Sequence, residues 1–120
     1  MAFQGIKISG EGVPEVSPEE TERVGVREAA EGVELIDVRR PDEYVGELGH
    51  VPGAKLVTLE TDFMKWVATA PKDKTYVFIC RSGMRSGRAT LFARSNGIAN
   101  TYNMEGGMLE WNARGLKTTR

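Results

Sequence analysis

Short apolar runs alternate along this chain with segments whose apolar residues recur at helical spacing. Five segments have the character of strands: they are residues 13–16, 34–38, 54–59, 74–80 and 98–104. The unbroken apolar run in the fourth, Val77-Phe78-Ile79, is typical of a strand buried on both faces of a parallel sheet. Strands alternating with helices predict an α/β fold with a central parallel sheet of about five strands and helices on both faces.

The first helix is predicted from its capping residues. Ser17-Pro18-Glu19-Glu20 supplies an N-cap, a proline at the first helical position and the glutamate of a capping box. We expect this helix to run to about Ala30, with Gly32 as its terminator. Gly25 lies inside it and costs about 1 kcal/mol relative to alanine, so it could split the helix.

The later helices are predicted from apolar spacing and from glycines. A short helix is expected over 41–44, and an amphipathic helix after Glu60 has apolar residues at i, i+3, i+4 and i+7, namely Phe63, Trp66, Val67 and Ala70. After the fourth strand a helix that ends at Gly97 has one face lined by Ala89, Phe92 and Ala93. Gly106-Gly107 then turns the chain into a final helix, on which we expect Trp111 to close over the core as a lid.

The composition is that of one small domain. The 120 residues include a single cysteine and a single histidine, too few for an internal disulfide or for a structural zinc site, which needs about four such ligands. There is no apolar run of about 18 residues and no signal segment after Met1, so we expect a cytoplasmic protein without a membrane partner. Residues 13–120 are expected to form the domain, preceded by an N-terminal arm or edge strand over residues 1–12.

Charge is unevenly distributed along the chain. Residues 1–50 contain five Lys or Arg and twelve Asp or Glu, whereas residues 51–120 contain eleven and five. The basic half holds the single cysteine, which favours a small anionic substrate there. Nucleic acid is not an expected partner, because the basic residues do not cluster among aromatic ones.

The strongest candidate site is the stretch Cys80-Arg81-Ser82-Gly83-Met84-Arg85-Ser86, which follows the predicted central strand and leads into a helix. This position places the sulfur under backbone N–H groups at the positive end of that helix, where a thiolate is favoured. Two arginines add positive charge, and the small serines and glycine allow successive amides to converge on an anion. The stretch predicts a thiolate nucleophile; the alternative is a buried cysteine with only a packing role.

Three further stretches accompany the cysteine stretch. They are Leu35-Ile36-Asp37-Val38-Arg39 with Glu43-Tyr44 after it, Gly49-His50-Val51-Pro52-Gly53-Ala54, and Gly106-Gly107-Met108 followed by Trp111. Together, and in this order, the four stretches resemble the single-domain rhodaneses, the thiosulfate sulfurtransferase family. The resemblance extends from about Val16 to Leu116 and implies a rhodanese-like fold.

The resemblance also implies a reaction. Cys80 would attack the outer sulfur of thiosulfate or a similar donor and hold it as a persulfide, which a thiophilic acceptor such as cyanide or a thiol then removes. Substrate binding is expected, through loop amides and the Arg85 guanidinium, at Arg81, Ser82, Gly83, Met84, Arg85 and Ser86. Neither a metal nor an organic cofactor is required. The expected partners are the anionic donor and its acceptor, which could be a protein thiol.

Two other functions stay open. Cysteine-based phosphatases and arsenate reductases have five residues between the cysteine and arginine of a similar loop. Four separate Cys80 from Arg85 here, and the shorter loop favours sulfur over phosphate chemistry. A persulfide relay or binding module for a protein partner would use the same residues, and the sequence does not distinguish a relay from a thiosulfate enzyme.

Three polar residues outside the cysteine stretch have competing interpretations. Asp37 and Arg39 come at the carboxyl end of a predicted strand, where they would either face the cysteine loop or bond neighbouring loops. The resemblance favours the second role. His50 lies in a Gly-His-Val-Pro-Gly loop and is expected to be a hydrogen-bonding structural residue rather than a general base.

Overall fold

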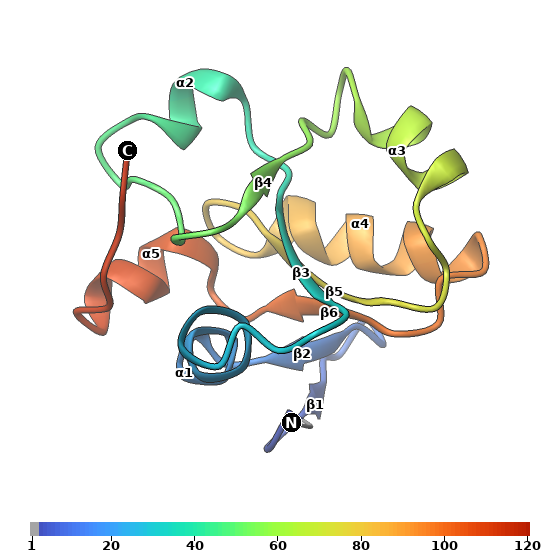
Figure 1. Cartoon of the computed structure of the whole chain (residues 1–120), viewed down its shortest axis with the longest axis horizontal. Helices are drawn as coiled ribbons and strands as arrows, with labels where there is room; N and C mark the ends of the chain where they lie inside the picture. The colour runs from blue at the N-terminus through green and yellow to red at the C-terminus, as the bar shows by residue number, and fades with distance from the viewer. Residues whose placement is uncertain (1–2) are drawn as a thin grey trace.

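A mixed sheet of six strands forms the centre of the computed structural model, which describes residues 3–120 (Figure 1). The strands are β1 (Lys7–Ile8), β2 (Pro14–Val16), β3 (Val33–Asp37), β4 (Lys55–Leu56), β5 (Thr75–Ile79) and β6 (Thr101–Met104). Their order is β1-β2-β6-β5-β3-β4, in which β1 is antiparallel to β2 and all other neighbours are parallel. The predicted parallel sheet is confirmed, and β1 adds an antiparallel edge strand from the segment expected as an arm or edge strand. Residues 1–2 of that segment lie outside the described residues.

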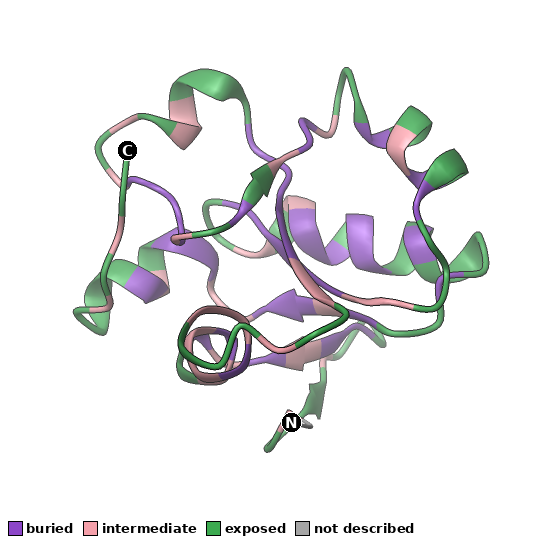
Figure 2. Ribbon diagram, in the orientation of Figure 1, coloured by how far each residue is buried: buried purple, intermediate pink, exposed green. Residues whose placement is uncertain are grey.

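Helices cover both faces of the sheet. They are α1 (Pro18–Glu20), the π-helical segment η1 (Thr21–Arg27), α2 (Pro41–Tyr44), α3 (Phe63–Thr69), α4 (Met84–Ser95) and α5 (Gly107–Ala113). Apolar residues of α3 and α4 pack on one face of the sheet, and those of η1 and α5 pack on the other. The buried side of α4 faces β5 and β6 (Figure 2). No helix within residues 3–120 is long and apolar enough to cross a membrane.

The central strand β5 determines where the cysteine lies. Its side chains alternate between the two cores, with Tyr76 and Phe78 on the α3 and α4 side and Val77 and Ile79 on the α5 side. Cys80 is the next residue, continues the alternation toward α4, and is fully buried. The strand therefore delivers the thiol to the loop from which α4 begins.

The first helix differs from the single α-helix predicted over residues 17–30. Ser17 acts as the expected N-cap, since its Oγ accepts a hydrogen bond of 3.1 Å from the Glu20 N–H. After one turn the chain continues as the π-helix η1, which contains Gly25. A Cβ at Gly25 would lie 2.7 Å from Leu35 Cδ2, so glycine permits the close approach of η1 to β3.

Two local expectations were wrong. Trp111 is completely buried in the core under α5, with its Nε1 donating to the Lys117 carbonyl, and it is not a lid. The strand expected over residues 54–59 is reduced to the two residues of β4, and beyond it the Val57 and Leu59 N–H groups still donate to the Asp37 and Val38 carbonyls. Ala89 and Ala93 form the predicted apolar face of α4, and Phe92 beside them is 37% exposed while its ring contacts that of Phe63 on α3, with centroids 6.0 Å apart.

A buried ion pair closes the carboxyl end of β3. The Arg39 Nη2 lies 2.8 Å from Asp37 Oδ2, and the two side chains are 1% and 0% exposed. The same nitrogen donates to the Gly49 carbonyl at 2.7 Å, and the Arg39 carbonyl accepts a bond from Thr58 Oγ1. These contacts give the pair the role of bonding neighbouring loops, as the resemblance implied.

Replacing Asp37 with alanine should lower the free energy of unfolding by about 3–5 kcal/mol, because Arg39 would remain buried without a counter-charge. Asp42→Ala is the matched control: its pair with Arg40 is largely exposed, with side chains 72% and 57% accessible, so its loss should cost much less than that of the buried pair. Urea unfolding of both variants measures the difference. Equal losses would show that the buried pair contributes no more than a surface pair.

Candidate active site

The cysteine lies at the junction of β5 and α4. Between Ile79, the last residue of the strand, and Met84, the first of the helix, the loop turns at Gly83 with φ of 97°, a conformation that glycine adopts readily. The Gly83 N–H donates to Cys80 Sγ at 3.0 Å, and Ser86 Oγ lies 3.2 Å from the same sulfur. The turn therefore brings a backbone donor and a hydroxyl onto the thiol.

The N–H groups around the turn are available to a ligand. Within residues 3–120 none of five such groups donates to a protein acceptor, and they belong to Arg81, Ser82, Met84, Arg85 and Ser86. The last three are the first N–H groups of α4, which have no partner within a helix. Together with Gly83 they make a run of backbone donors that starts at the residue after the cysteine. Such a run is suited to hold an anion next to the sulfur.

Arg85 is oriented by an acidic residue of α2. Its Nη1 and Nη2 donate to Glu43 Oε1 and Oε2, both at 2.9 Å, in a bidentate pair that joins α4 to α2. The hydrogen bonds from Arg85 hold the pKa of Glu43 at about 2, below its ordinary 4.5. The pKa of Arg85 is raised, mainly by Glu43 and in smaller part by the nearby Cys80. The guanidinium is thus fixed close to the thiol with its charge already paired.

The first turn of α5 binds two carbonyl groups of the cysteine loop. The Met108 N–H donates to the Cys80 carbonyl at 2.8 Å, and the Leu109 N–H donates to the Arg81 carbonyl at 3.0 Å. This close approach requires glycine at position 107, where φ is 58° and a Cβ would lie 2.5 Å from the Cys80 oxygen. The Gly-Gly sequence after β6 therefore allows α5 to approach the cysteine loop closely enough to form these hydrogen bonds.

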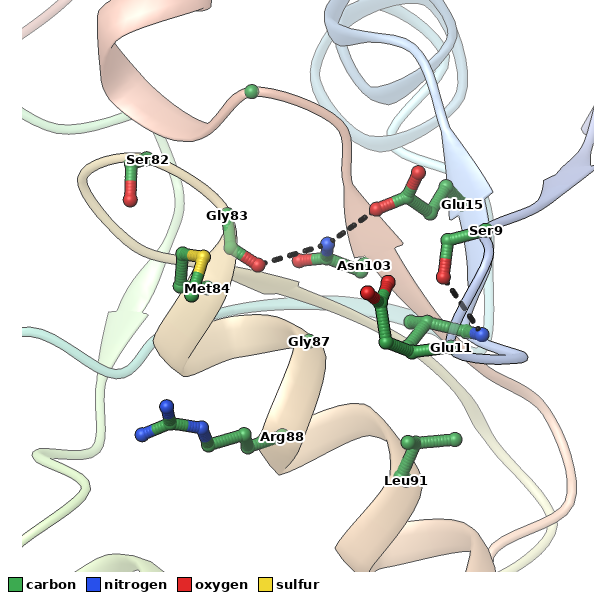
Figure 3. Close-up of a pocket in the computed structure, with 12 residues that line it drawn as sticks. Ser9, Glu11, Glu15, Ser82, Gly83, Met84, Gly87, Arg88, Leu91 and Asn103 are labelled. Atoms are coloured by element: carbon green, nitrogen blue, oxygen red, sulfur yellow. Dashed lines mark hydrogen bonds between the residues drawn. The ribbon is translucent and has the colours of Figure 1, made fainter.

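Asn103 of β6 connects the loop to the edge of the sheet. Its Nδ2 donates to Glu15 Oε2 at 2.8 Å and to the Gly83 carbonyl at 3.1 Å, as the dashed lines of Figure 3 show. Its Oδ1 lies 2.5 Å from Ser86 Oγ. A chain of polar contacts thus runs from the partly buried carboxylate on β2 to the buried hydroxyl beside the sulfur.

Several predicted binding residues line two cavities beside the loop. Ser82, Gly83 and Met84 line one of about 420 Å³ that lies between α4 and the N-terminal hairpin (Figure 3). Arg81 lines another of about 240 Å³, next to α2. Of the six expected binding residues, Gly83 and Ser86 lie within hydrogen-bond distance of the sulfur. The substrate-binding role of the six stays a prediction.

The single histidine is held within the α2 loop. Its Nδ1 lies 2.8 Å from the Tyr44 carbonyl, and its ring stacks on the Tyr44 ring with centroids 3.6 Å apart. The backbone of His50 pairs with Thr119 near the C-terminus. These contacts agree with the structural role expected from its loop.

Sequence reasoning did not assign a site role to Glu43, Asn103 or Gly107. Glu43 and Gly107 stand inside stretches already singled out, but their partners are far away in the chain. Asn103 could have been found from the alternation of side chains along β6. Tyr102 and Met104 lie in the core under α5. The intervening residues Thr101 and Asn103 therefore point to the opposite face, toward α4.

The parallel sheet and a cysteine loop between its central strand and a helix define a rhodanese-like protein. The family described as Rhodanese-like domain matches residues 22–114, and this chain belongs to it. The predicted family and fold are therefore confirmed.

Relatives with curated names point to sulfur transfer. The chain is 46% identical over 84 residues to "Putative sulfurtransferase YtwF" of Bacillus subtilis (strain 168), which is 70% of this chain and 78% of that protein. It is 28% identical over 83 residues to "Thiosulfate sulfurtransferase GlpE" of Pseudoalteromonas translucida, covering 69% and 76%. A crystal structure of a rhodanese-like domain protein from Staphylococcus aureus superposes with a TM-score of 0.71 at 27% identity, covering 88% and 98% of the two chains.

Gly107→Ala should distort the cysteine loop, because the new Cβ would overlap the Cys80 and Arg81 carbonyls. The matched control is Gly115→Ala, which has a similar φ of 71° but nothing within 4 Å of its Cβ. Both variants carry the strain of a positive φ, so the difference isolates the overlap. Gly107→Ala should lose about 1–3 kcal/mol more in urea unfolding. Equal losses would mean that α5 can move away from the loop without cost.

The Glu43–Arg85 pair should make stability depend on pH in the acid range. Because the folded pKa of Glu43 is about 2, against 4.5 ordinarily, its contribution is complete above pH 4.5 and is lost as pH falls toward 2. The stability difference between wild type and Glu43→Gln should therefore shrink across this interval. Glu47→Gln, an exposed position whose carboxylate forms no ion pair within residues 3–120, is the control. A Glu43→Gln deficit that stays constant down to pH 2 would contradict the assignment.

Proposed function

We propose that this rhodanese-like protein is a thiosulfate sulfurtransferase that carries sulfane sulfur on Cys80. The observation that supports this most is the run of backbone N–H groups from Arg81 to Ser86, one donating to Sγ and five without a protein acceptor in the described chain. A packing role accounts for the burial of Cys80 but not for these donors. Backbone donors without partners are costly unless water or a ligand satisfies them.

The proposed reaction has two displacements. The Cys80 thiolate attacks the outer sulfur of thiosulfate, a new S–S bond forms, and sulfite leaves with the electron pair of the broken S–S bond. Cyanide or a thiolate then attacks the outer sulfur of the persulfide, and Cys80 leaves as the thiolate. Neither step changes the total charge, and neither requires a redox partner.

Each group around the sulfur has a role in this scheme. The donor run would stabilise the outer sulfur of the persulfide, which bears the negative charge, without reorganisation during the reaction. Arg85, fixed by Glu43, would offer its remaining N–H groups to the anionic donor. The α5 contacts to the Cys80 and Arg81 carbonyls keep the loop in the shape that points its N–H groups outward.

The acceptor is a separate part of the proposal. Cyanide is a convenient acceptor, and a low-molecular-weight or protein thiol is chemically equivalent, so a persulfide relay would use the same intermediate. The GlpE relative, named as a thiosulfate sulfurtransferase, supports thiosulfate as the donor. The thiol acts only while it is reduced, and we propose the cytoplasm as the compartment.

Intact-mass spectrometry of the purified protein after exposure to thiosulfate should show one added sulfur atom, which cyanide removes as thiocyanate. Cys80→Ala and Cys80→Ser should abolish both the addition and the turnover, with the circular dichroism spectrum unchanged. An aryl phosphate should not be hydrolysed by the wild type, because the four-residue spacing to Arg85 makes a tighter loop than phosphate requires.

Three other outcomes have distinct meanings. Thiocyanate formation by Cys80→Ala would exclude the persulfide route. Loading by a persulfide donor, but not by thiosulfate, would favour the relay. Phosphatase activity that depends on Cys80, without any added sulfur, would replace the sulfurtransferase proposal with a phosphatase.

A further inference from the structure

The hydroxyl of Ser86 lies between two acceptors. Its Oγ is 2.5 Å from Asn103 Oδ1 and 3.2 Å from Cys80 Sγ. A serine hydroxyl has one proton and two lone pairs, so it can donate fully to only one of these neighbours. The direction of that proton decides whether Ser86 stabilises a thiolate or accepts the proton of a thiol.

The orientation of the Asn103 amide settles this direction. Both Nδ2 protons are used, one by Glu15 Oε2 at 2.8 Å and one by the Gly83 carbonyl at 3.1 Å (Figure 3). A carbonyl and an ionised carboxylate only accept hydrogen bonds, so the reversed amide would place Oδ1 against two acceptors. Oδ1 therefore faces Ser86, and the proton between Oδ1 and Oγ can come only from the serine.

We propose that Asn103 is a positioning residue that turns the Ser86 proton away from Cys80. Ser86 then presents a lone pair to the sulfur and accepts a hydrogen bond from the Cys80 thiol. The Gly83 N–H, at 3.0 Å, is left as the donor to Sγ. If Cys80 is a thiolate, its negative charge lies against a lone pair of Ser86 Oγ, which is unfavourable. Ser86 can donate to the thiolate only if its hydrogen bond to Asn103 is broken.

A consequence for sulfur transfer follows, and it rests on the proposed function. In the empty enzyme the negative charge is on Sγ, next to the Ser86 lone pair. In the persulfide the charge moves to the outer sulfur, and Sγ becomes an uncharged atom with two covalent bonds. The Asn103–Ser86 arrangement therefore disfavours the free thiolate and leaves the loaded form unaffected, so it favours retention of sulfur on Cys80.

Other charged side chains lie around the cysteine loop. They are Arg85 of α4 with Glu43 of α2 paired to it, Arg81 in the loop, and Glu15 of β2 behind Asn103. Ser86→Ala leaves all four and their hydrogen bonds in place, so a changed titration of the thiol in this variant can be assigned to the hydroxyl. Asn103→Ala removes the hydrogen bond to Glu15 and therefore needs the double variant as a control.

The sign of the Ser86→Ala effect distinguishes the two hydrogen-bond directions. Cys80 is the single cysteine of the chain, so thiolate absorbance measured against pH reports it alone. Under the proposal, Ser86→Ala removes an acceptor of the thiol proton, so the midpoint of the titration moves to lower pH. At a pH below the midpoint, the fraction of Cys80 present as thiolate should rise about threefold. If Ser86 donates to the thiolate in the wild type, the titration moves to higher pH, and that result or an unchanged curve overturns the proposal.

Two further variants complete the test. Ser95→Ala on the same helix, whose Oγ donates to the Phe92 carbonyl, should leave the titration unchanged. Asn103→Ala should also move it to lower pH, because Ser86 becomes free to donate to the thiolate. The added effect of Asn103→Ala should disappear in the Ser86→Ala background. A shift of equal size there would assign the effect to the lost hydrogen bonds to Gly83 and Glu15 and overturn the role of Asn103.

The titration is independent of the proposed reaction. It uses no sulfur donor, so failure of the protein to accept sulfur from thiosulfate leaves the Ser86 result interpretable. Conversely, sulfur transfer with an unchanged titration in Ser86→Ala would retain the proposed function and reject the role of Asn103.

Discussion

The contact between the start of α5 and the back of the cysteine loop is the constraint on which the site depends. Two carbonyls of the loop, those of Cys80 and Arg81, accept hydrogen bonds from α5, and this is possible because residue 107 has no side chain. With its carbonyls bound on the inner side, the loop has its N–H groups left for the outer side. The N–H donors are therefore available because α5 binds the loop through its carbonyls. A cysteine placed before a helix would not by itself produce this arrangement.

The sequence predicted the parts of the site that come from one continuous segment. The apolar run of β5 and its alternation placed Cys80 at the start of a helix, and the glycine and serines of the loop indicated a turn rich in N–H donors. The partners of these residues could not be predicted in this way. Glu43 is 42 residues from Arg85 and Glu15 is 88 from Asn103, and no periodicity relates such positions.

The errors in the fold have a similar origin. Local preferences predicted one α-helix over residues 17–30. In the structure residues 21–27 form a π-helix instead, and Gly25 of this segment packs against Leu35 on β3. Trp111 was expected to be a lid on the final helix, yet it is completely buried in the core under α5. In both cases tertiary packing overrides what the local sequence favours.

The cysteine loop has partners that are distant in the sequence, and this affects the thiol before the chain has folded. The groups that distinguish this thiol from an ordinary cysteine come from β2, α2, β6 and α5, and they meet only when nearly all the long-range contacts have formed. In a nascent or partly unfolded molecule these groups are far apart, so the thiol lacks the surroundings that the fold gives it. Any reaction that depends on them therefore requires the folded molecule.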